Sequence, residues 1–217
     1  MPPKPGRLAS IFRACVHWEA LTQAVRRDGL AALGRPRQIR DAASAKLLTG
    51  NFIAYEDTTI VLELGPGPGN QTHRYDTSLV KHVYGVEPNP HFKDDIDAKL
   101  DKRGLRDRYT LIACGVEDSD VLREVGITEG SLDAVLCIQV LCAVKDPNNV
   151  MKEVWKLLKP GGKFIFWEHG WSRNRLTTVA QDIVNSGEWE NTHEIEEPED
   201  PFSLLPRIQG VLVKKKA

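Results

Sequence analysis

The sequence has no apolar run long enough to cross a lipid bilayer. Its longest, residues 135–144, is half of the roughly 20 residues that a membrane-spanning helix needs, so we expect no membrane span. The beginning of the chain lacks the apolar stretch of a secretion signal, and Glu19 and Asp28 argue against an Arg-rich mitochondrial leader. These features favour a cytoplasmic protein.

Cysteine is scarce, and its spacing fits neither a zinc ribbon nor a redox pair. We therefore expect reduced, mostly buried thiols and no metal site; the four cysteines are Cys15, Cys114, Cys137 and Cys142. The formal net charge is only -1, so the overall charge does not indicate that the protein binds nucleic acid or a membrane surface. Basic residues nevertheless gather in the first fifty positions and glutamates in residues 188–200. We interpret the basic N-terminal segment as a solvated amphipathic helix. The alternative is a basic arm that binds phosphate or an acidic partner.

The N-terminal quarter of the chain carries a helical pattern of apolar residues. Five of them recur at helical spacing before the stop signal Gly29, namely Ile11, Cys15, Trp18, Leu21 and Val25. We expect residues 1–57 to be a helical lead-in or cap and residues 58–217 to form the main domain. In a folded protein another surface must cover this apolar stripe. The helix would pack as a lid over the site, pack on a flank of the domain or form a dimer contact, so a homodimer is one of the alternatives.

The rest of the chain alternates between strand and helix patterns. Short apolar runs predict strands at residues 60–64, 82–86, 109–114, 132–138, 163–168, 192–196 and 208–213. Asp146 and Pro147 begin a helix that Pro160 and the glycines after it stop, and a weaker helix covers residues 175–185. We expect an α/β fold: a doubly wound, mostly parallel seven-stranded sheet with helices on both faces and a C-terminal antiparallel hairpin.

A glycine turn follows the first predicted strand. Gly65, Gly67 and Gly69 allow backbone N–H groups to approach a ligand closely, and a following helix would add positive potential. The dinucleotide pattern G-x-G-x-x-G fails in both registers, because Asn70 and Thr72 stand where its last glycine belongs. The turn therefore argues against a nicotinamide or flavin cofactor.

Glu87 ends the second predicted strand, 24 positions after Glu63 (87 minus 63). An acidic residue near this place in such a topology accepts both hydroxyls of a ribose. The alternative is an exposed glutamate at a strand end. The Pro88-Asn89-Pro90 turn would hold its carboxylate at the carboxyl edge of the sheet, where ligands of open α/β sheets bind.

Four motifs together resemble class I S-adenosylmethionine-dependent methyltransferases. In the order of that family they are Val61-Leu62-Glu63-Leu64-Gly65-Pro66-Gly67-Pro68-Gly69, Val86-Glu87-Pro88-Asn89-Pro90, Leu132-Asp133-Ala134-Val135-Leu136-Cys137 and Leu157-Leu158-Lys159-Pro160-Gly161-Gly162-Lys163-Phe164. The resemblance covers about residues 58–170. Residues 140–144 and the Trp167-Glu168-His169 run look like the small-molecule branch related to thiol methyltransferases.

The resemblance implies S-adenosylmethionine as cofactor and assigns residues to each part of it. Those around the methionine part are Glu63, Leu64, Gly65, Pro66, Gly67 and Gly69; Glu87 and Pro88 serve the ribose, and Gly115, Val116 and Glu117 the adenine. Cys137, Ile138 and Gln139 would face the sulfonium and the acceptor, although core packing explains the first two equally well. A buried amide such as Gln139 needs hydrogen-bond partners.

The implied activity is methyl transfer to a small-molecule nucleophile, with an O, S, N or C acceptor left open. His169, at the end of the fifth strand, is the candidate base, although a lone histidine is more often structural. Trp18 and Tyr55 are candidates for the wall of the acceptor pocket.

Two departures from the family support a second function. Pro66 and Pro68 remove N–H donors from the turn, and only residues 170–174 stand where relatives carry part of a lid. The alternative is a cofactor-binding protein that does not methylate, acting as a partner subunit or catalysing another reaction. A protein or nucleic-acid substrate is disfavoured because no Asn-Pro-Pro or Asp-Pro-Pro motif follows the fourth strand.

Overall fold

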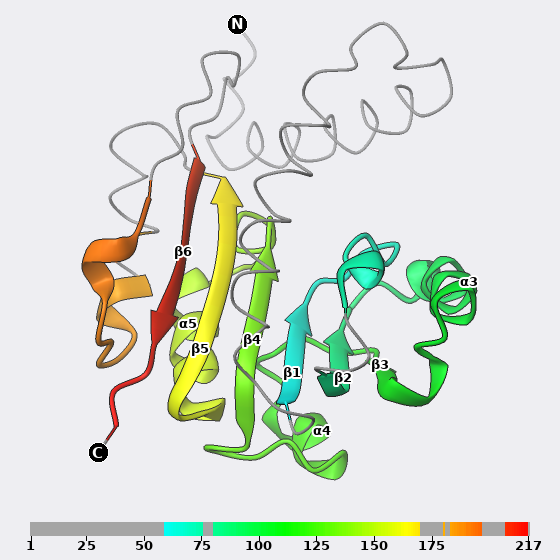
Figure 1. The fold of residues 1–217 in the computed structure, drawn as a ribbon, viewed down its shortest axis with the longest axis horizontal. Coiled ribbons are helices and arrows are strands. Elements are labelled where there is room, and N and C mark those ends of the chain that lie inside the picture. Colours follow the sequence, from blue (N-terminus) through cyan, green and yellow to red (C-terminus); the bar gives the residue numbers. More distant parts are fainter. Residues whose placement is uncertain (1–58, 76–79, 170–179, 181–182, 197–206, 217) are drawn as a thin grey trace, which may run out of the picture. The chain divides into compact units, whose positions relative to one another are not determined.

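The computed structural model describes residues 59–75, 80–169, 180, 183–196 and 207–216. In these residues six strands form one sheet in the order β3-β2-β1-β4-β5-β6 (Figure 1). They are β1 (Thr59–Leu64), β2 (Val80–Val86), β3 (Tyr109–Ile112), β4 (Leu132–Ile138), β5 (Leu158–His169) and β6 (Arg207–Val213). Neighbouring strands are parallel except β5 and β6, which are antiparallel. The doubly wound, mostly parallel sheet is confirmed.

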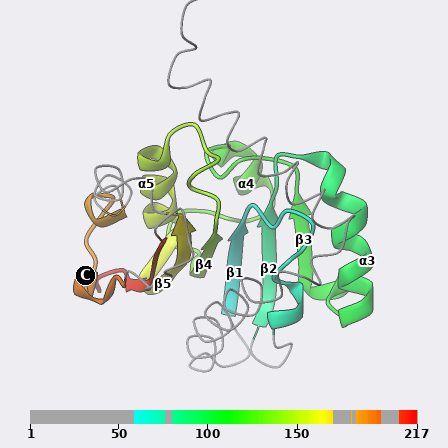
Figure 2. The same cartoon turned by 90° about the horizontal axis from the view of Figure 1, so that it is seen from above.

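Two apolar cores lie on opposite faces of the sheet. Successive residues of β1 divide between them, as Val61 joins one cluster and Leu62 the other. Helix α3 (Lys93–Arg103) covers the first cluster with Ile96 and Leu100, while α4 (Ser119–Glu124) and α5 (Pro147–Leu157) contribute to the second. Figure 2 shows α4 and α5 along the same side of the sheet. Burial on both faces explains why the strands read as continuous apolar runs.

Helix α5 begins where the sequence predicts, but it ends at Leu157, before the predicted stop at Pro160. The Asp146 carboxylate accepts a hydrogen bond from Asn149 N (3.1 Å), and Pro147 occupies the first turn. Strand β5 starts earlier than predicted, at Leu158. Its pairing with β4 passes from Leu132–Leu158 to Ala134–Lys163, so three extra residues of β5 bulge there.

The strand predicted at residues 192–196 is wrong. Thr192–Glu194 is instead the 3₁₀ helix η5. The segment meets β6 at two isolated bridges, Trp189 with Lys214 and Glu196 with Gln209. Between the two bridges the chain advances seven residues from Trp189 to Glu196 but only five from Gln209 to Lys214. The 3₁₀ turn accommodates the two extra residues. A seventh strand is absent from the described residues, and the antiparallel pairing of the C-terminal region is that of β5 with β6.

Asn191 takes the place of backbone pairing beside this turn. Its amide oxygen accepts a hydrogen bond from Val213 N (2.9 Å), and its amide nitrogen donates to Val211 O (2.7 Å). One side chain thus satisfies two polar groups on the outer edge of β6, where an unpaired strand edge would be costly if buried.

The remaining helical turns are short. They are η2 (Thr72–Arg74), which lies in the connection between β1 and β2, η3 (Pro90–Phe92) and η4 (Arg106–Arg108). The predicted helices of residues 1–57 and, for the most part, of residues 175–185 lie outside the described residues. None of the described helices has the length and apolar character to span a membrane.

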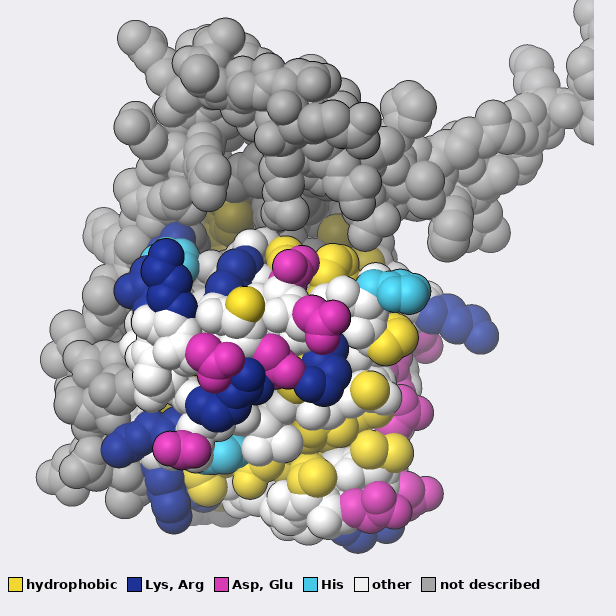
Figure 3. Space-filling model, turned by 90° about the vertical axis from the view of Figure 1, so that its right-hand side faces the viewer, with side chains coloured by type: hydrophobic (Ala, Val, Ile, Leu, Met, Phe, Trp, Pro, Cys, Tyr) yellow, Lys and Arg dark blue, Asp and Glu magenta, His cyan; other side chains and the backbone are white. Residues whose placement is uncertain are grey.

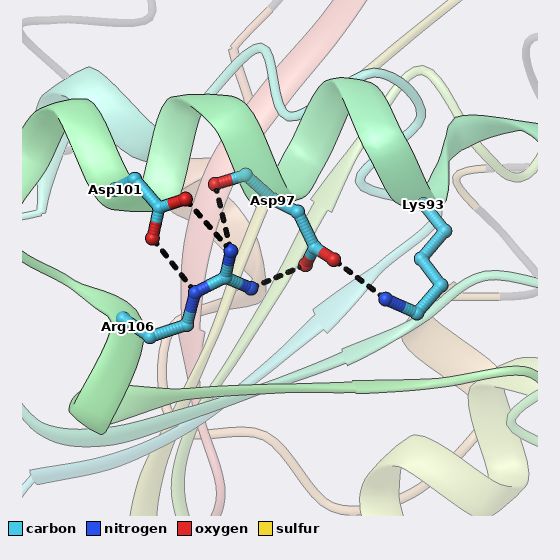
Figure 4. Close-up of polar contacts among 4 residues, drawn as sticks. All are labelled: Lys93, Asp97, Asp101 and Arg106. Atoms are coloured by element: carbon cyan, nitrogen blue, oxygen red, sulfur yellow. Dashed lines mark hydrogen bonds and ion pairs between the residues drawn. The ribbon is translucent and has the colours of Figure 1, made fainter.

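Charges of both signs are interspersed on the face of the domain that carries α3 (Figure 3). Arg106 binds Asp97 (2.7 Å) and Asp101 (2.8 Å), and Lys93 binds Asp97 (2.5 Å), as Figure 4 shows. The hydrogen bond from Lys93 is the main cause that lowers the pKa of Asp97. These exposed pairs clamp η4 to α3 but add little stability individually, because solvent screens them.

Candidate functional site

The three glycines after β1 form a turn with a left-handed backbone at each of them. Their φ angles are +53° at Gly65, +54° at Gly67 and +74° at Gly69. Residues with a side chain rarely adopt this conformation, so glycine is needed there. Hydrogen bonds from Gly65 N to Val86 O (2.9 Å) and from Gly69 N to Pro66 O (3.0 Å) hold the turn at the carboxyl end of β1.

The three glycines meet different surroundings. A Cβ on Gly65 would lie 2.9 Å from Val140 Cγ2, and one on Gly69 would lie 3.4 Å from the Cα of Ile96 in α3. A Cβ on Gly67 would have nothing within 4 Å. Gly65 and Gly69 therefore allow close packing inside the protein, whereas Gly67 leaves backbone open to a ligand.

Glu87 joins two turns at the carboxyl edge of the sheet. It is 8% exposed, and its Oε2 accepts a hydrogen bond from Gly67 N (2.9 Å) while Oε1 accepts one from Asn89 N (2.9 Å). An ionised carboxylate has about four acceptor positions, so two remain for a ligand. The Gly67 contact puts these positions beside the open part of the glycine turn.

Glu63 lies in the core beneath that turn. Its Oε2 accepts hydrogen bonds from the hydroxyls of Tyr75 (2.8 Å) and Tyr109 (2.9 Å). Tyr109 reaches it from β3 across Gly85 of β2, where a Cβ would collide with the phenol. Burial raises the pKa of Glu63 to about 7, against the opposing effect of the two tyrosines. In the described structure, two core tyrosines thus donate to this carboxylate.

The residues assigned to the adenine follow β3. Val116 is buried and Glu117 is exposed, and a Cβ on Gly115 would lie 2.5 Å from Glu117 Oε2. A hydrogen bond from Glu87 N to Ile112 O (3.0 Å) ties the end of β3 to the end of β2. The loop therefore leaves the sheet at the same edge as the glycine turn.

The tip of β4 combines core residues with a strained one. Cys137 is fully buried and donates to Glu168 Oε1 (3.2 Å), and Ile138 packs against the opposite core. Gln139 has a φ of +61°, the only positive value of a non-glycine residue in the described chain, and its N–H donates to Trp167 O (2.8 Å). Such strain is often retained at functional sites.

Glu168 is a buried acidic residue to which the sequence prediction gave no role. Its carboxylate accepts hydrogen bonds from Val140 N (2.9 Å), Leu141 N (3.2 Å) and the thiol of Cys137. Burial raises its pKa to about 7. The available signal was a carboxylate inside an apolar strand, because a buried charge requires hydrogen-bond donors.

The other predicted residues have varied positions. Leu64 and Pro66 are buried, and Pro88 is exposed. His169 is the last residue of β5, but its side chain lies outside the described structure, as do Trp18 and Tyr55. No cluster of metal-ligating side chains occurs in the described part of the chain.

The sheet order and the glycine turn after β1 define a Rossmann-like α/β protein, a class whose ligands bind at the carboxyl edge of the sheet. Two solved structures share the fold. The [4+2]-cyclase SpnF superposes with a TM-score of 0.61 at 13% identity, over 81% of each chain. A putative S-adenosylmethionine-dependent methyltransferase of Listeria monocytogenes gives 0.58 at 15% identity, over 80% of this chain and 100% of that one.

Sequence comparison finds related domains over about half of the chain. Residues 62–166 match the family described as methyltransferase domain. Human thiol S-methyltransferase TMT1B is 37% identical over 110 residues, which are 50% of this chain and 42% of that protein. The chain thus matches less than half the length of this curated relative. Residues 62–166 are thus similar to a methyltransferase domain, and the fold is the one found in S-adenosylmethionine-dependent methyltransferases, as the motifs predict.

The residues at the carboxyl edge fit S-adenosylmethionine, the cofactor of this class. Gly67 offers open backbone, and Glu87 keeps two acceptor positions for hydroxyl donors. The side-chain oxygen of Gln71, just after the turn, is buried and accepts no hydrogen bond in the described structure. An acceptor of this kind suits the ammonium group of the cofactor.

Glu63 makes the stability of the domain depend on pH. Its pKa is about 7 in the folded protein and near 4.5 when unfolded, so between these values the folded state binds more protons. The free energy of unfolding therefore falls as pH rises from about 4.5 to about 7, by the order of 3 kcal/mol. Glu168 acts in the same direction. Thermal unfolding at pH 5 and at pH 8 gives the loss of stability between these two pH values. Glu63→Gln should remove about half of the loss that Glu63 and Glu168 cause together. Glu124→Gln, which changes an exposed carboxylate on α4, is the control. A decline as steep in Glu63→Gln as in wild type would contradict the assignment.

The left-handed backbone at Gln139 predicts an unusual order of stability among variants. Gln139→Ala and Gln139→Gly both remove the side chain, but only glycine adopts this conformation without strain. Gln139→Gly should therefore be more stable than Gln139→Ala by about 1 kcal/mol in urea unfolding. The same pair of substitutions at helical Lys152 should show the reverse order. Equal stability at position 139 would mean that the backbone there is not left-handed.

Proposed function

We propose that this chain transfers the methyl group of S-adenosylmethionine to a small-molecule nucleophile, and that the acceptor atom is the sulfur of a thiol. The observation that carries the proposal is the open backbone of Gly67 beside the spare acceptor positions of Glu87. The thiol acceptor is supported by the likeness to TMT1B and TMT1A, two human proteins that are named thiol S-methyltransferases.

The cofactor parts are assigned along the carboxyl edge. The backbone of residues 64–69 surrounds the methionine part, with Glu63 beneath it, and Glu87 accepts the ribose hydroxyls while Pro88 shapes its turn. Gly115, Val116 and Glu117 flank the adenine. The tip of β4, from Cys137 to Gln139, faces the sulfonium, with Gln139 the residue nearest the acceptor.

The task of the protein is alignment and exclusion of water. When bound, S-adenosylmethionine supplies a methyl group that its sulfonium charge already activates. A thiol ionises near neutral pH without much help, so a thiolate acceptor needs only to be held in line with the methyl group. His169 is the candidate base for an acceptor that keeps its proton, because it ends β5 at this edge.

The setting of the reaction belongs to the same proposal. Cys114 and Cys137 are buried thiols within the apolar core, which supports a reducing compartment such as the cytoplasm. The face with interspersed charges offers no one-signed surface for nucleic acid, so we propose a small-molecule partner. The N-terminal residues 1–57 are proposed as a cap over the acceptor, alone or within a homodimer.

A direct assay tests the activity. The protein is incubated with methyl-labelled S-adenosylmethionine and a matched panel of alkyl thiols, phenols, carboxylates and amines. We expect label in the thioether products of the thiols, and the His169→Ala variant should retain most of it because a thiolate needs no base. Label in no product, with cofactor binding intact, would favour the alternative of a protein that binds the cofactor without methylating.

Cofactor affinity should depend on Glu87. Glu87→Ala removes two charge-assisted hydrogen bonds to the ribose, so calorimetry should show S-adenosylhomocysteine binding at least about tenfold weaker. Asp133→Ala is a matched control, because that carboxylate also accepts a backbone hydrogen bond, from Ile60 N (2.8 Å), but at the opposite edge of the sheet. Equal affinity in folded Glu87→Ala and in Asp133→Ala would exclude the ribose role.

A further inference from the structure

Glu168 places a carboxylate among apolar neighbours in β5. It is 1% exposed and follows Trp167 and Phe166, both buried, near the end of β5. Burying a charge among apolar residues costs several kcal/mol unless donors compensate it. A residue of this kind is retained where its hydrogen bonds fix something that an apolar side chain cannot.

In the described part of the chain, the donors to this carboxylate come from one short segment, residues 137–141. Val140 N and Leu141 N donate at 2.9 Å and 3.2 Å, and the thiol of Cys137 donates at 3.2 Å. They belong to the end of β4 and to residues 139–141, which leave the sheet at its carboxyl edge. Glu168 therefore acts as an anchor for the chain just beyond β4.

The anchored segment is strained and touches the glycine turn. Gln139 is left-handed, so the chain bends sharply after β4, and the next residue, Val140, lies against Gly65. The turn itself has separate supports, since Gly65 binds Val86 O and Gly67 binds Glu87. Loss of Glu168 would deprive Val140 N and Leu141 N of their acceptor, while the glycine turn and the hydrogen bond from Gln139 N to Trp167 O stay in place.

We propose that Glu168 is a positioning residue that holds residues 139–141 against the glycine turn and keeps Gln139 in its strained conformation. It does not touch the reacting atoms. Its effect on turnover rests on the proposed methyl transfer, whereas its effect on the segment does not. The acceptor side of the site is thus fixed from inside the core.

Glu168→Gln tests this directly. An amide presents one oxygen and one NH₂, so an NH₂ group must face a backbone N–H where the carboxylate accepted a hydrogen bond. We expect the amide protons of Val140 and Leu141 to exchange at least about tenfold faster by NMR. We expect kcat with a thiol acceptor to fall at least tenfold, while affinity for S-adenosylhomocysteine changes less than threefold.

A destabilised variant with an intact anchor separates positioning from general stability. Val154→Ala creates a cavity in the same core from α5 but keeps every hydrogen bond of Glu168. It should lower the melting temperature without changing kcat or selectively exposing Val140 and Leu141. If Glu168→Gln does not fold, Glu168→Asp withdraws the carboxylate by one methylene and should give the same selective exchange.

The outcomes separate the two proposals. Unchanged exchange at Val140 and Leu141 in a folded Glu168 variant would overturn the positioning role. Selectively faster exchange with unchanged kcat would likewise overturn its link to turnover. Absence of methyl transfer by the wild-type protein would refute the proposed function alone, because the exchange measurement still decides whether Glu168 holds the segment.

Discussion

Backbone N–H groups that leave the carboxyl edge of a parallel sheet have no strand to pair with, and this constraint organises the domain. Two buried carboxylates meet it. Glu87 accepts hydrogen bonds from the glycine turn and from the turn after β2, and Glu168 accepts them from the segment after β4. Both carboxylates of the candidate site therefore stabilise the loops around it by accepting backbone hydrogen bonds.

The sequence predicts those parts of the fold that local patterns determine. Continuous apolar runs locate β1, β2 and β4, and the cap at Asp146 locates α5. The strand expected at residues 192–196 fails because a register mismatch with β6 is resolved by a helical turn and by the side chain of Asn191. Such a mismatch involves two segments that the sequence does not show to be neighbours.

The candidate site divides in the same way. The glycine turn and Glu87 are local features, and the structure joins them by a hydrogen bond. The contacts of Glu63 with Tyr109 and of Glu168 with Val140 link residues 46 and 28 positions apart, so no local pattern reveals them. The sequence thus indicates candidate ligand residues more readily than the residues that hold them in place.

The crossing of Tyr109 over Gly85 to reach Glu63 also limits how this protein can diverge. A side chain at position 85 and a phenol at position 109 exclude one another, and loss of the phenol would deprive a buried acid of one of its donors. A change at any of the three positions is therefore tolerated best when the others change with it. Across descendants of this sequence, Glu63, Gly85 and Tyr109 should be inherited or replaced together as one epistatic unit, although they belong to three different strands.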